Sequence, residues 1–259
     1  MRKKYLLLLA FVGLVVLLAG CTQTGQPITS ESEGIWNEVF VYPLSWVIIK
    51  IAQIFNNSYG LSIIIVTIFL RLLILPLSVK QIKSSKAMQE VQPKLQEIQK
   101  KYSSKDANTQ QKLQQETMKL MQEHNVNPLA GCLPIIVQMP ILIAMYHAIV
   151  RTYEISNYSF LWFELGSPDN ILPFITGILT FFQSKLMMST NTSANSNPQV
   201  AMQMKMMLYV MPIMITVMAF MFPAALALYW ATGNVFMILQ TILINKPLMS
   251  NNNSGGVKK

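Results

Sequence analysis

The chain has 259 residues, of which 52% are hydrophobic and only 12% are charged. Soluble domains carry about 25% charged residues, so this composition is that of an integral membrane protein. The net charge of +9 would suggest nucleic-acid binding in a soluble protein, but here it must first be compared with the distribution of lysine and arginine around membrane spans. Two cysteines make no disulfide framework.

The N-terminus has the pattern of a bacterial lipoprotein signal sequence. Three basic residues precede an apolar run from Tyr5 to Leu18 and the tetrapeptide Leu18-Ala19-Gly20-Cys21. The tetrapeptide resembles a lipobox, which implies removal of residues 1–20 as a signal peptide and attachment of lipid to the Cys21 thiol outside the cell. The alternative is an uncleaved anchor helix with a chance Ala-Gly-Cys sequence.

Two segments follow the lipobox. Residues 21–34 are polar and predict a flexible external tether. Residues 35–57 are amphipathic, and we expect a helix in the outer membrane interface with Trp36 and Trp46 among the lipid head groups. A first transmembrane span is the alternative, which Lys50 disfavours.

Residues 59–79 predict the first transmembrane helix, and they contain one arginine. Arg71 lies roughly 15 Å from Leu61 at about 1.5 Å per residue, close to the middle of a hydrocarbon layer about 30 Å thick. An isolated arginine there costs between ~2.5 and ~17 kcal/mol, so Arg71 is expected to face a polar interior or water. The alternative is a structural arginine that snorkels or pairs inside a helical bundle.

Residues 80–126 hold nine lysines and predict a cytoplasmic segment. Apolar residues recur at intervals of three and four in two stretches, which the turn at Ser103–Asn108 separates. We therefore expect two helices folded into an antiparallel hairpin. An orientation signal alone would explain the charge but not the apolar periodicity.

Four further apolar stretches bring the predicted spans to five. Residues 151–170 would form an extracellular loop, 189–205 a cytoplasmic loop and 246–259 a basic cytoplasmic tail. With an external N-terminus, alternating spans place fourteen lysines on the cytoplasmic side and only Lys50 and Arg151 outside. The basic charge is thus explained by orientation and not by nucleic acid. The four stretches are residues 129–150, 171–188, 206–222 and 223–245.

Polar side chains in the spans are candidates to line a hydrated cavity around Arg71. No predicted span contains an acidic residue, so we expect amides, hydroxyls, carbonyls and water to solvate the guanidinium. One glutamine more often bridges helices than forms a site, but several polar residues with one arginine favour a site. The candidates are Thr67, Gln138, Thr176, Thr180, Gln183, Tyr229, Trp230 and Asn234.

The fourth predicted span is rich in methionine, whose unbranched side chain adapts to many apolar partners. We interpret Met211, Met214 and Met218 as a hydrophobic slide for substrate segments, with lipid-facing filler as the alternative. His124 and His147 have no carboxylate or thiol at ligand spacing, so no metal is expected. The sequence also lacks phosphate-loop, Gly-x-Ser-x-Gly and His-Glu-x-x-His motifs, and neither an enzyme nor a cofactor is predicted.

Three features together resemble the YidC family of membrane-protein insertases. They are the stretch Asn127–Ile141 (NPLAGCLPIIVQMPI), the stretch Phe222–Asn234 (FPAALALYWATGN), and an arginine-bearing span followed by a lysine-rich hairpin. The similarity covers about residues 35–246, and the lipobox with five spans is similar to the Gram-positive form. Ala225 stands where many relatives have glycine, which affects only local helix packing.

The resemblance implies an all-α integral membrane protein of the cell membrane. Five transmembrane helices would surround a hydrophilic groove that contains Arg71 and opens to cytosol and lipid, with a cytoplasmic hairpin and an external interfacial helix. Polar segments of nascent membrane proteins would enter the groove while hydrophobic segments slide along the second and fourth spans into lipid.

The resemblance further implies partners for the hairpin and for the groove, namely anionic lipids, the ribosome, signal-recognition components and the Sec translocon. Interpretations from other classes are a channel or carrier for small anions, which would use Arg71 as its binding charge, and a structural lipoprotein scaffold. The scaffold would leave Arg71 unexplained.

Overall fold

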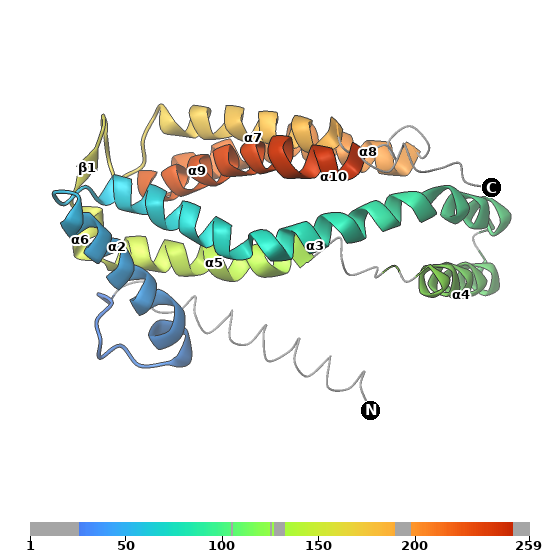
Figure 1. Ribbon diagram of the computed structural model, residues 1–259, viewed down its shortest axis with the longest axis horizontal. Coiled ribbons are helices and arrows are strands. Elements are labelled where there is room, and N and C mark those ends of the chain that lie inside the picture. Colours follow the sequence, from blue (N-terminus) through green and yellow to red (C-terminus); the bar gives the residue numbers. More distant parts are fainter. Residues whose placement is uncertain (1–25, 105, 125, 127–132, 190–197, 251–259) are drawn as a thin grey trace. The chain divides into compact units, whose positions relative to one another are not determined.

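The computed structural model describes residues 26–104, 106–124, 126, 133–189 and 198–250, most of which lie in helices (Figure 1). The predicted signal peptide and Cys21 lie outside the described residues. The elements in chain order are η1 (Asn37–Val41, a π-helix), α2 (Tyr42–Ile54), α3 (Tyr59–Lys101), α4 (Ala107–Glu123), α5 (Leu133–Arg151), α6 (Tyr153–Ser156), β1 (Ser159–Phe160), β2 (Phe163–Glu164), α7 (Leu172–Ser189), α8 (Pro198–Met221), α9 (Ala224–Gln240), η4 (Thr241–Asn245, a π-helix) and α10 (Lys246–Ser250).

The chain forms two compact units. Unit 1 contains the described residues of Met1–Phe69, Ile136–Thr176 and Thr216–Thr232. Unit 2 contains those of Leu70–Ile135, Gly177–Ile215 and Gly233–Lys259.

The fold is that of a helical membrane protein, as predicted. Among the described residues, three helical segments are long and apolar enough to cross a membrane: Tyr59–Lys101, Met204–Met221 and Ala224–Leu248. A shorter apolar segment is Ile136–Arg151. Helices α5 and α7 correspond to the second and third predicted spans, and their membrane crossing stays a prediction.

Helix α3 continues without a break from the predicted first span into the predicted hairpin. Its 43 residues include Pro76 and Pro93, and neither proline ends it. The lysine, glutamine, glutamate and alanine residues after residue 80 are good helix formers, which offsets the hydrogen bond that each proline removes. The boundary expected near residues 79 and 80 therefore has no counterpart in secondary structure.

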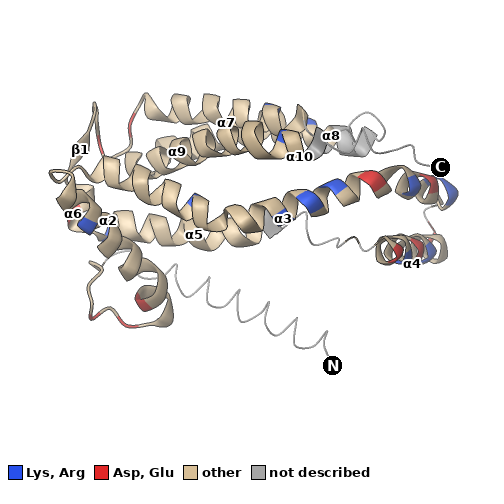
Figure 2. Cartoon of the chain, viewed as in Figure 1, with Lys and Arg blue, Asp and Glu red and all other residues tan. Residues whose placement is uncertain are grey.

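Helices α3 and α4 form a hairpin within unit 2. Val91 and Leu95 of α3 bury their side chains against Leu120 of α4. Beside them, Lys94 Nζ lies 2.9 Å from His124 Nε2. Val91 and Leu95 precede the turn between α3 and α4, and Leu120 follows it. The chain therefore reverses direction at the turn, and the two helices are antiparallel as predicted. Most lysines of unit 2 lie on this hairpin (Figure 2).

Helix α4 begins at an aspartate cap. The Asp106 carboxylate accepts hydrogen bonds from the Ser104 hydroxyl at 2.6 Å and from the Thr109 backbone N–H at 2.9 Å. These bonds stabilise the charged form, so they lower the pKa of the Asp106 carboxyl. The cap fixes the point where α4 starts after the turn.

In unit 1, η1 and α2 form the helix predicted over residues 35–57. One side of it is buried, with Trp36 and Val41 in a cluster that includes Ala144 and Ala148 of α5. Trp36 is therefore packed against α5 and does not lie among lipid head groups as expected. The opposite side leaves large apolar residues exposed, among them Val39 and Trp46. An exposed apolar side is what a helix in the membrane interface requires, and that location stays a prediction.

The described part of the predicted tether is fastened to the end of α5. Arg151 is only 4% exposed, and it donates from Nε to the Gln26 carbonyl and from Nη1 to Asn37 Oδ1, each at 2.8 Å. The Ile28 N–H donates to the Arg151 carbonyl at 3.0 Å. Arg151, expected as an external loop charge, is thus a buried cation that holds residues 26–28.

Candidate functional site

Arg71 is partly buried on α3, and its guanidinium lies against the backbone of α9 in unit 2. A Cβ atom built on Gly233 would lie 2.8 Å from Arg71 Nη2 and 3.4 Å from Nε. The shorter distance is too close for two non-bonded atoms, so only glycine leaves the guanidinium in this position. Gly233 was part of the family-like stretch but was not predicted as a site residue.

Asn234, the next residue on α9, contacts α7. Its Nδ2 donates a hydrogen bond of 2.7 Å to Thr180 Oγ1, and Thr180 is buried. Consecutive residues of α9 therefore contact α3 through Gly233 and α7 through Asn234. Three of the predicted site residues thus meet in unit 2: Arg71 and Thr180 contact consecutive residues of α9, the second of which is Asn234.

Gln183, the remaining candidate in unit 2, lies three residues after Thr180 on α7. Its amide is partly buried, and Nε2 lies 3.9 Å from the Met187 sulfur one turn farther along the helix. A thioether is a weak acceptor, so this contact leaves the amide able to bind a stronger partner.

In unit 1 the two predicted threonines are fully buried and bonded to backbone. Thr67 Oγ1 donates to the Ile63 carbonyl at 2.6 Å. Thr176 Oγ1 lies 2.9 Å from the Leu172 carbonyl and 3.2 Å from the Ala227 carbonyl on α9. Both hydroxyls therefore satisfy helix carbonyls, and Thr176 links α7 to α9.

Gln138 and Tyr229 form a hydrogen bond between α5 and α9 in unit 1. Gln138 Nε2 donates to Tyr229 Oη at 2.7 Å, and Tyr229 is 2% exposed. Two residues that the sequence pattern assigned to a substrate groove are therefore paired with each other. The pair stabilises the contact between the two helices.

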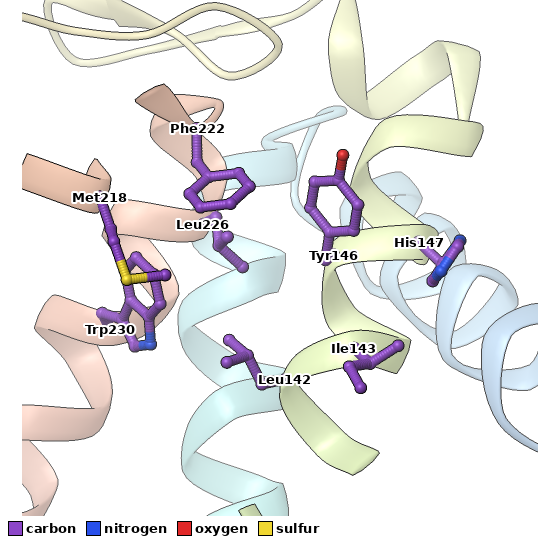
Figure 3. Close-up of a pocket in the computed structure, with 8 residues that line it drawn as sticks. All are labelled: Leu142, Ile143, Tyr146, His147, Met218, Phe222, Leu226 and Trp230. Carbon is purple, nitrogen blue, oxygen red and sulfur yellow. The ribbon is translucent and has the colours of Figure 1, made fainter. Parts of the chain in front are cut away.

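Trp230 and Met218 border an apolar pocket in unit 1 with a volume of about 300 Å³ (Figure 3). The pocket lies between α5, the end of α8 and the start of α9. Sequence reasoning named Trp230 and Met218 but did not predict the pocket, because its walls come from segments far apart in the chain. The other lining residues are Leu142, Ile143, Tyr146, His147, Phe222 and Leu226.

The other two residues of the predicted hydrophobic slide lie on α8 in unit 2. Met211 and Met214 are exposed, as are Met206 and Met207 earlier in the helix. Exposed methionines suit contact with a hydrophobic substrate segment or with lipid, so this geometry leaves both interpretations open. Among the described residues, no group of three or more His, Cys, Asp or Glu side chains could hold a metal ion.

Comparison with known proteins gives one consistent result. The family model described as 60Kd inner membrane protein matches residues 50–252. Membrane protein insertase YidC of Oceanobacillus iheyensis is 71% identical over 250 residues, which are 96% of this chain and 99% of the relative. Membrane protein insertase MisCA of Bacillus subtilis is 56% identical over 265 residues, covering 100% of this chain and 99% of the relative.

A solved structure is also similar. It is an active YidC insertase crystal structure with the first transmembrane domain resolved, 28% identical to this chain with a TM-score of 0.59. The match covers 82% of this chain but only 47% of that protein, so this chain spans about half the length of that structure. The family match and the two relatives cover most of the sequence, and the chain belongs to the 60Kd inner membrane protein family, which includes the YidC insertases.

Proposed function

We propose that this chain is a membrane-protein insertase of the cell membrane and that Arg71 binds polar segments of its substrates. Relatives of 71% and 56% identity over nearly the whole chain carry the name insertase, which supports the general activity. The role of Arg71 is supported by its position. It lies on a helix that is apolar enough to cross a membrane, and its guanidinium lies against Gly233.

Arg71 offers chemistry suited to a polypeptide that loses its water. The guanidinium has five N–H donors and stays charged, so it can bind a carboxylate or two backbone carbonyls of a nascent membrane protein. The hydroxyl of Thr180 and the amides of Gln183 and Asn234 would supply further bonds. The membrane potential would then draw acidic segments outward with about 2.3 kcal/mol per charge per 100 mV.

The hydrophobic segment of the substrate would leave by another route. Met211 and Met214 are exposed on α8, and their flexible side chains suit segments of varied shape. In this proposal the segment slides along α8 into lipid while its polar neighbour is held at Arg71. No bond is made or broken, so the protein acts without a cofactor.

The lysine-rich hairpin and the lipobox indicate which partners the protein would have on each side of the membrane. The lysine-rich hairpin of α3 and α4 would bind anionic lipids, the ribosome or signal-recognition components on the cytoplasmic side. Lipid on Cys21 would anchor the N-terminus outside. Substrates would arrive with or without the Sec translocon.

Site-specific crosslinking tests the substrate site. A photoreactive residue at Gln183 is expected to crosslink to a nascent small membrane protein during insertion. Phe182 is the matched control, since it is adjacent but exposed on another face of α7. Equal crosslinking at both positions would indicate general contact with lipid-embedded chains and would contradict the site.

Substitution of Arg71 tests the charge. Arg71→Ala is expected to lower insertion of a substrate with an acidic external segment by about tenfold or more, because a hydrogen bond to a charged group contributes ~1.5–3 kcal/mol. Arg71→Lys keeps activity if charge suffices and loses it if bidentate bonding matters. Full insertion by Arg71→Ala with no crosslink at Gln183 would refute the proposal. Chloride flux through vesicles that depends on Arg71 would instead favour the anion channel.

A further inference from the structure

The β1–β2 hairpin of unit 1 ends in two exposed apolar residues. The strands pair antiparallel, with Ser159 opposite Glu164 and Phe160 opposite Phe163. Leu161 and Trp162 form the two-residue turn between them. Leu161 is 73% exposed and Trp162 is 52% exposed.

The residues of this turn are unfavourable for a turn exposed to water. Leu161 has a φ of 55°, in the left-handed region, where two-residue turns normally place glycine, asparagine or aspartate. Leucine has no polar atom that could offset the strain by a local hydrogen bond. A turn in water would therefore combine backbone strain with two exposed apolar side chains.

The two faces of the hairpin differ from its tip. Phe163 is buried, and its ring lies 5.9 Å from the Phe160 ring on the face toward the rest of unit 1. On the outward face Glu164 is exposed and accepts a hydrogen bond of 2.8 Å from the Ser167 hydroxyl. The base of the hairpin is thus polar where it faces solvent, whereas the tip is apolar.

The hairpin packs on the first turn of α3. A Cβ atom on Gly60 would overlap the Phe160 ring, so the absent side chain is what lets the hairpin sit there. The Tyr59 and Tyr158 rings lie 4.7 Å apart beside this contact. Since Tyr59 begins a helix that is apolar enough to cross a membrane, the hairpin lies where that helix would leave the hydrocarbon layer.

We propose that Leu161 and Trp162 insert into the boundary between lipid head groups and acyl chains at the Tyr59 end of α3. Tryptophan favours this boundary, because its indole is apolar and carries one N–H donor. The sequence from residue 152 to 184 contains no lysine or arginine, whereas Glu154, Glu164 and Asp169 lie near the hairpin. The contact is therefore apolar and interfacial and needs no anionic lipid. It holds the first turn of α3 at a defined level, whichever substrate the protein handles.

Fluorescence of Trp162 tests this insertion in the full chain, reconstituted in phosphatidylcholine vesicles. Trp36→Phe, Trp46→Phe and Trp230→Phe leave Trp162 as the only reporter, and thermal unfolding in detergent verifies the fold. Emission is expected to be shifted to the blue, and lipids brominated near the carbonyl end of the acyl chain should quench it more than lipids brominated near the methyl end. Water-like emission with strong quenching by aqueous iodide would overturn the proposal.

Leu161→Gly in the same background separates membrane contact from folding. Glycine suits a φ of 55°, so stability in detergent should be kept or raised, whereas bromolipid quenching of Trp162 should fall. Unchanged quenching would mean that Leu161 does not enter the lipid and would contradict its part in the proposal. A nitroxide on Leu161→Cys, in a chain with Cys21→Ser and Cys132→Ser, gives the same depth without the tryptophan changes. Contact of the label with aqueous nickel chelate but not with oxygen would refute insertion.

Discussion

At the scale of single residues, the position of the Arg71 guanidinium depends on Gly233, which has no side chain to occupy that space. A Cβ atom on Gly233 would lie 2.8 Å from Nη2. We expect Gly233→Ala to displace the guanidinium but to leave the fold intact, because the displaced atoms are the end of a flexible side chain. Insertion of a substrate with an acidic segment should fall by roughly tenfold, the effect of losing a hydrogen bond to a charged group. Insertion into vesicles and thermal unfolding in detergent measure the two effects.

Two controls isolate that effect. Val235→Ala changes an exposed residue of α9 two positions away and should leave insertion unchanged. In an Arg71→Lys background, Gly233→Ala should lower insertion by a smaller factor, because lysine has no planar guanidinium to place against position 233. An equal loss of insertion in both backgrounds would show that Gly233 is needed for helix packing and not for the position of the Arg71 guanidinium.

The hydrogen bond between Gln138 and Tyr229 is a second residue-scale feature, and its role can be measured. Tyr229→Phe removes the acceptor and should lower the free energy of unfolding in detergent by about 1 kcal/mol, as polar contacts between membrane helices do. The double variant with Gln138→Leu should lower the free energy of unfolding by less than the sum of the losses in the two single variants. If insertion falls while stability is unchanged, the pair contacts substrate and the structural assignment is wrong.

The same pair illustrates what sequence can predict about a site. Polar residues in apolar helices are visible in the sequence, and eight of them were predicted to surround Arg71. The partner of each hydroxyl or amide is not visible, because Thr176 contacts Ala227 across 51 positions and Gln138 contacts Tyr229 across 91. Gly233 was recognisable in principle, since a glycine in an apolar membrane helix often lies where a neighbouring helix approaches closely.

At the scale of elements, α4 depends on the Asp106 cap, and this dependence predicts a pH effect. The pKa of the folded Asp106 carboxyl is lowered by hydrogen bonds from Ser104 and Thr109. A group whose folded pKa is lowered contributes stability above its ordinary pKa of 3.8 and loses it as pH falls further. The first turn of α4 should therefore fray below about pH 4 and be unaffected between pH 5 and pH 8.

Amide hydrogen exchange at residues 107–110 measures that fraying. Asp106→Asn keeps an acceptor at the cap and should remove the acid dependence while it preserves most of the protection. Asp106→Ala should expose the same amides at every pH. Acid-induced exchange that persists in Asp106→Asn would assign the effect to another carboxylate.

Element boundaries were predictable where periodicity is strong and were missed where tertiary contacts decide. The two apolar stripes predicted the packing of α3 on α4, because a spacing of three and four residues specifies one helix face. The change from apolar residues to lysine near residue 80 predicts where a membrane span ends, and α3 continues through this point because a change of charge does not interrupt a helix. The β1–β2 hairpin was missed, because its turn residues Leu161 and Trp162 carry none of the usual turn signals.

At the scale of the whole molecule, the length of α3 and the distribution of charge both bear on membrane orientation. Helix α3 has 43 residues, about twice the roughly 20 that a helix needs to cross the hydrocarbon layer. The half that begins at Tyr59 is apolar apart from Arg71, whereas the half that ends at Lys101 carries lysines (Figure 2). We therefore predict that the lysine-rich half lies in water, on the cytoplasmic side that the positive-inside rule assigns to lysine and arginine.

Labelling of introduced cysteines tests that orientation. Ser103→Cys lies in the turn of the α3–α4 hairpin, and Tyr153→Cys lies at an exposed position after α5. In intact cells that express a Cys132→Ser background, a membrane-impermeant maleimide is expected to label Tyr153→Cys and to reach Ser103→Cys only after lysis. The reason is that fourteen lysines lie on the predicted cytoplasmic side and only Lys50 and Arg151 on the other. Labelling of Ser103→Cys in intact cells would reverse the orientation, and the lysines of the hairpin would then need an explanation other than the positive-inside rule.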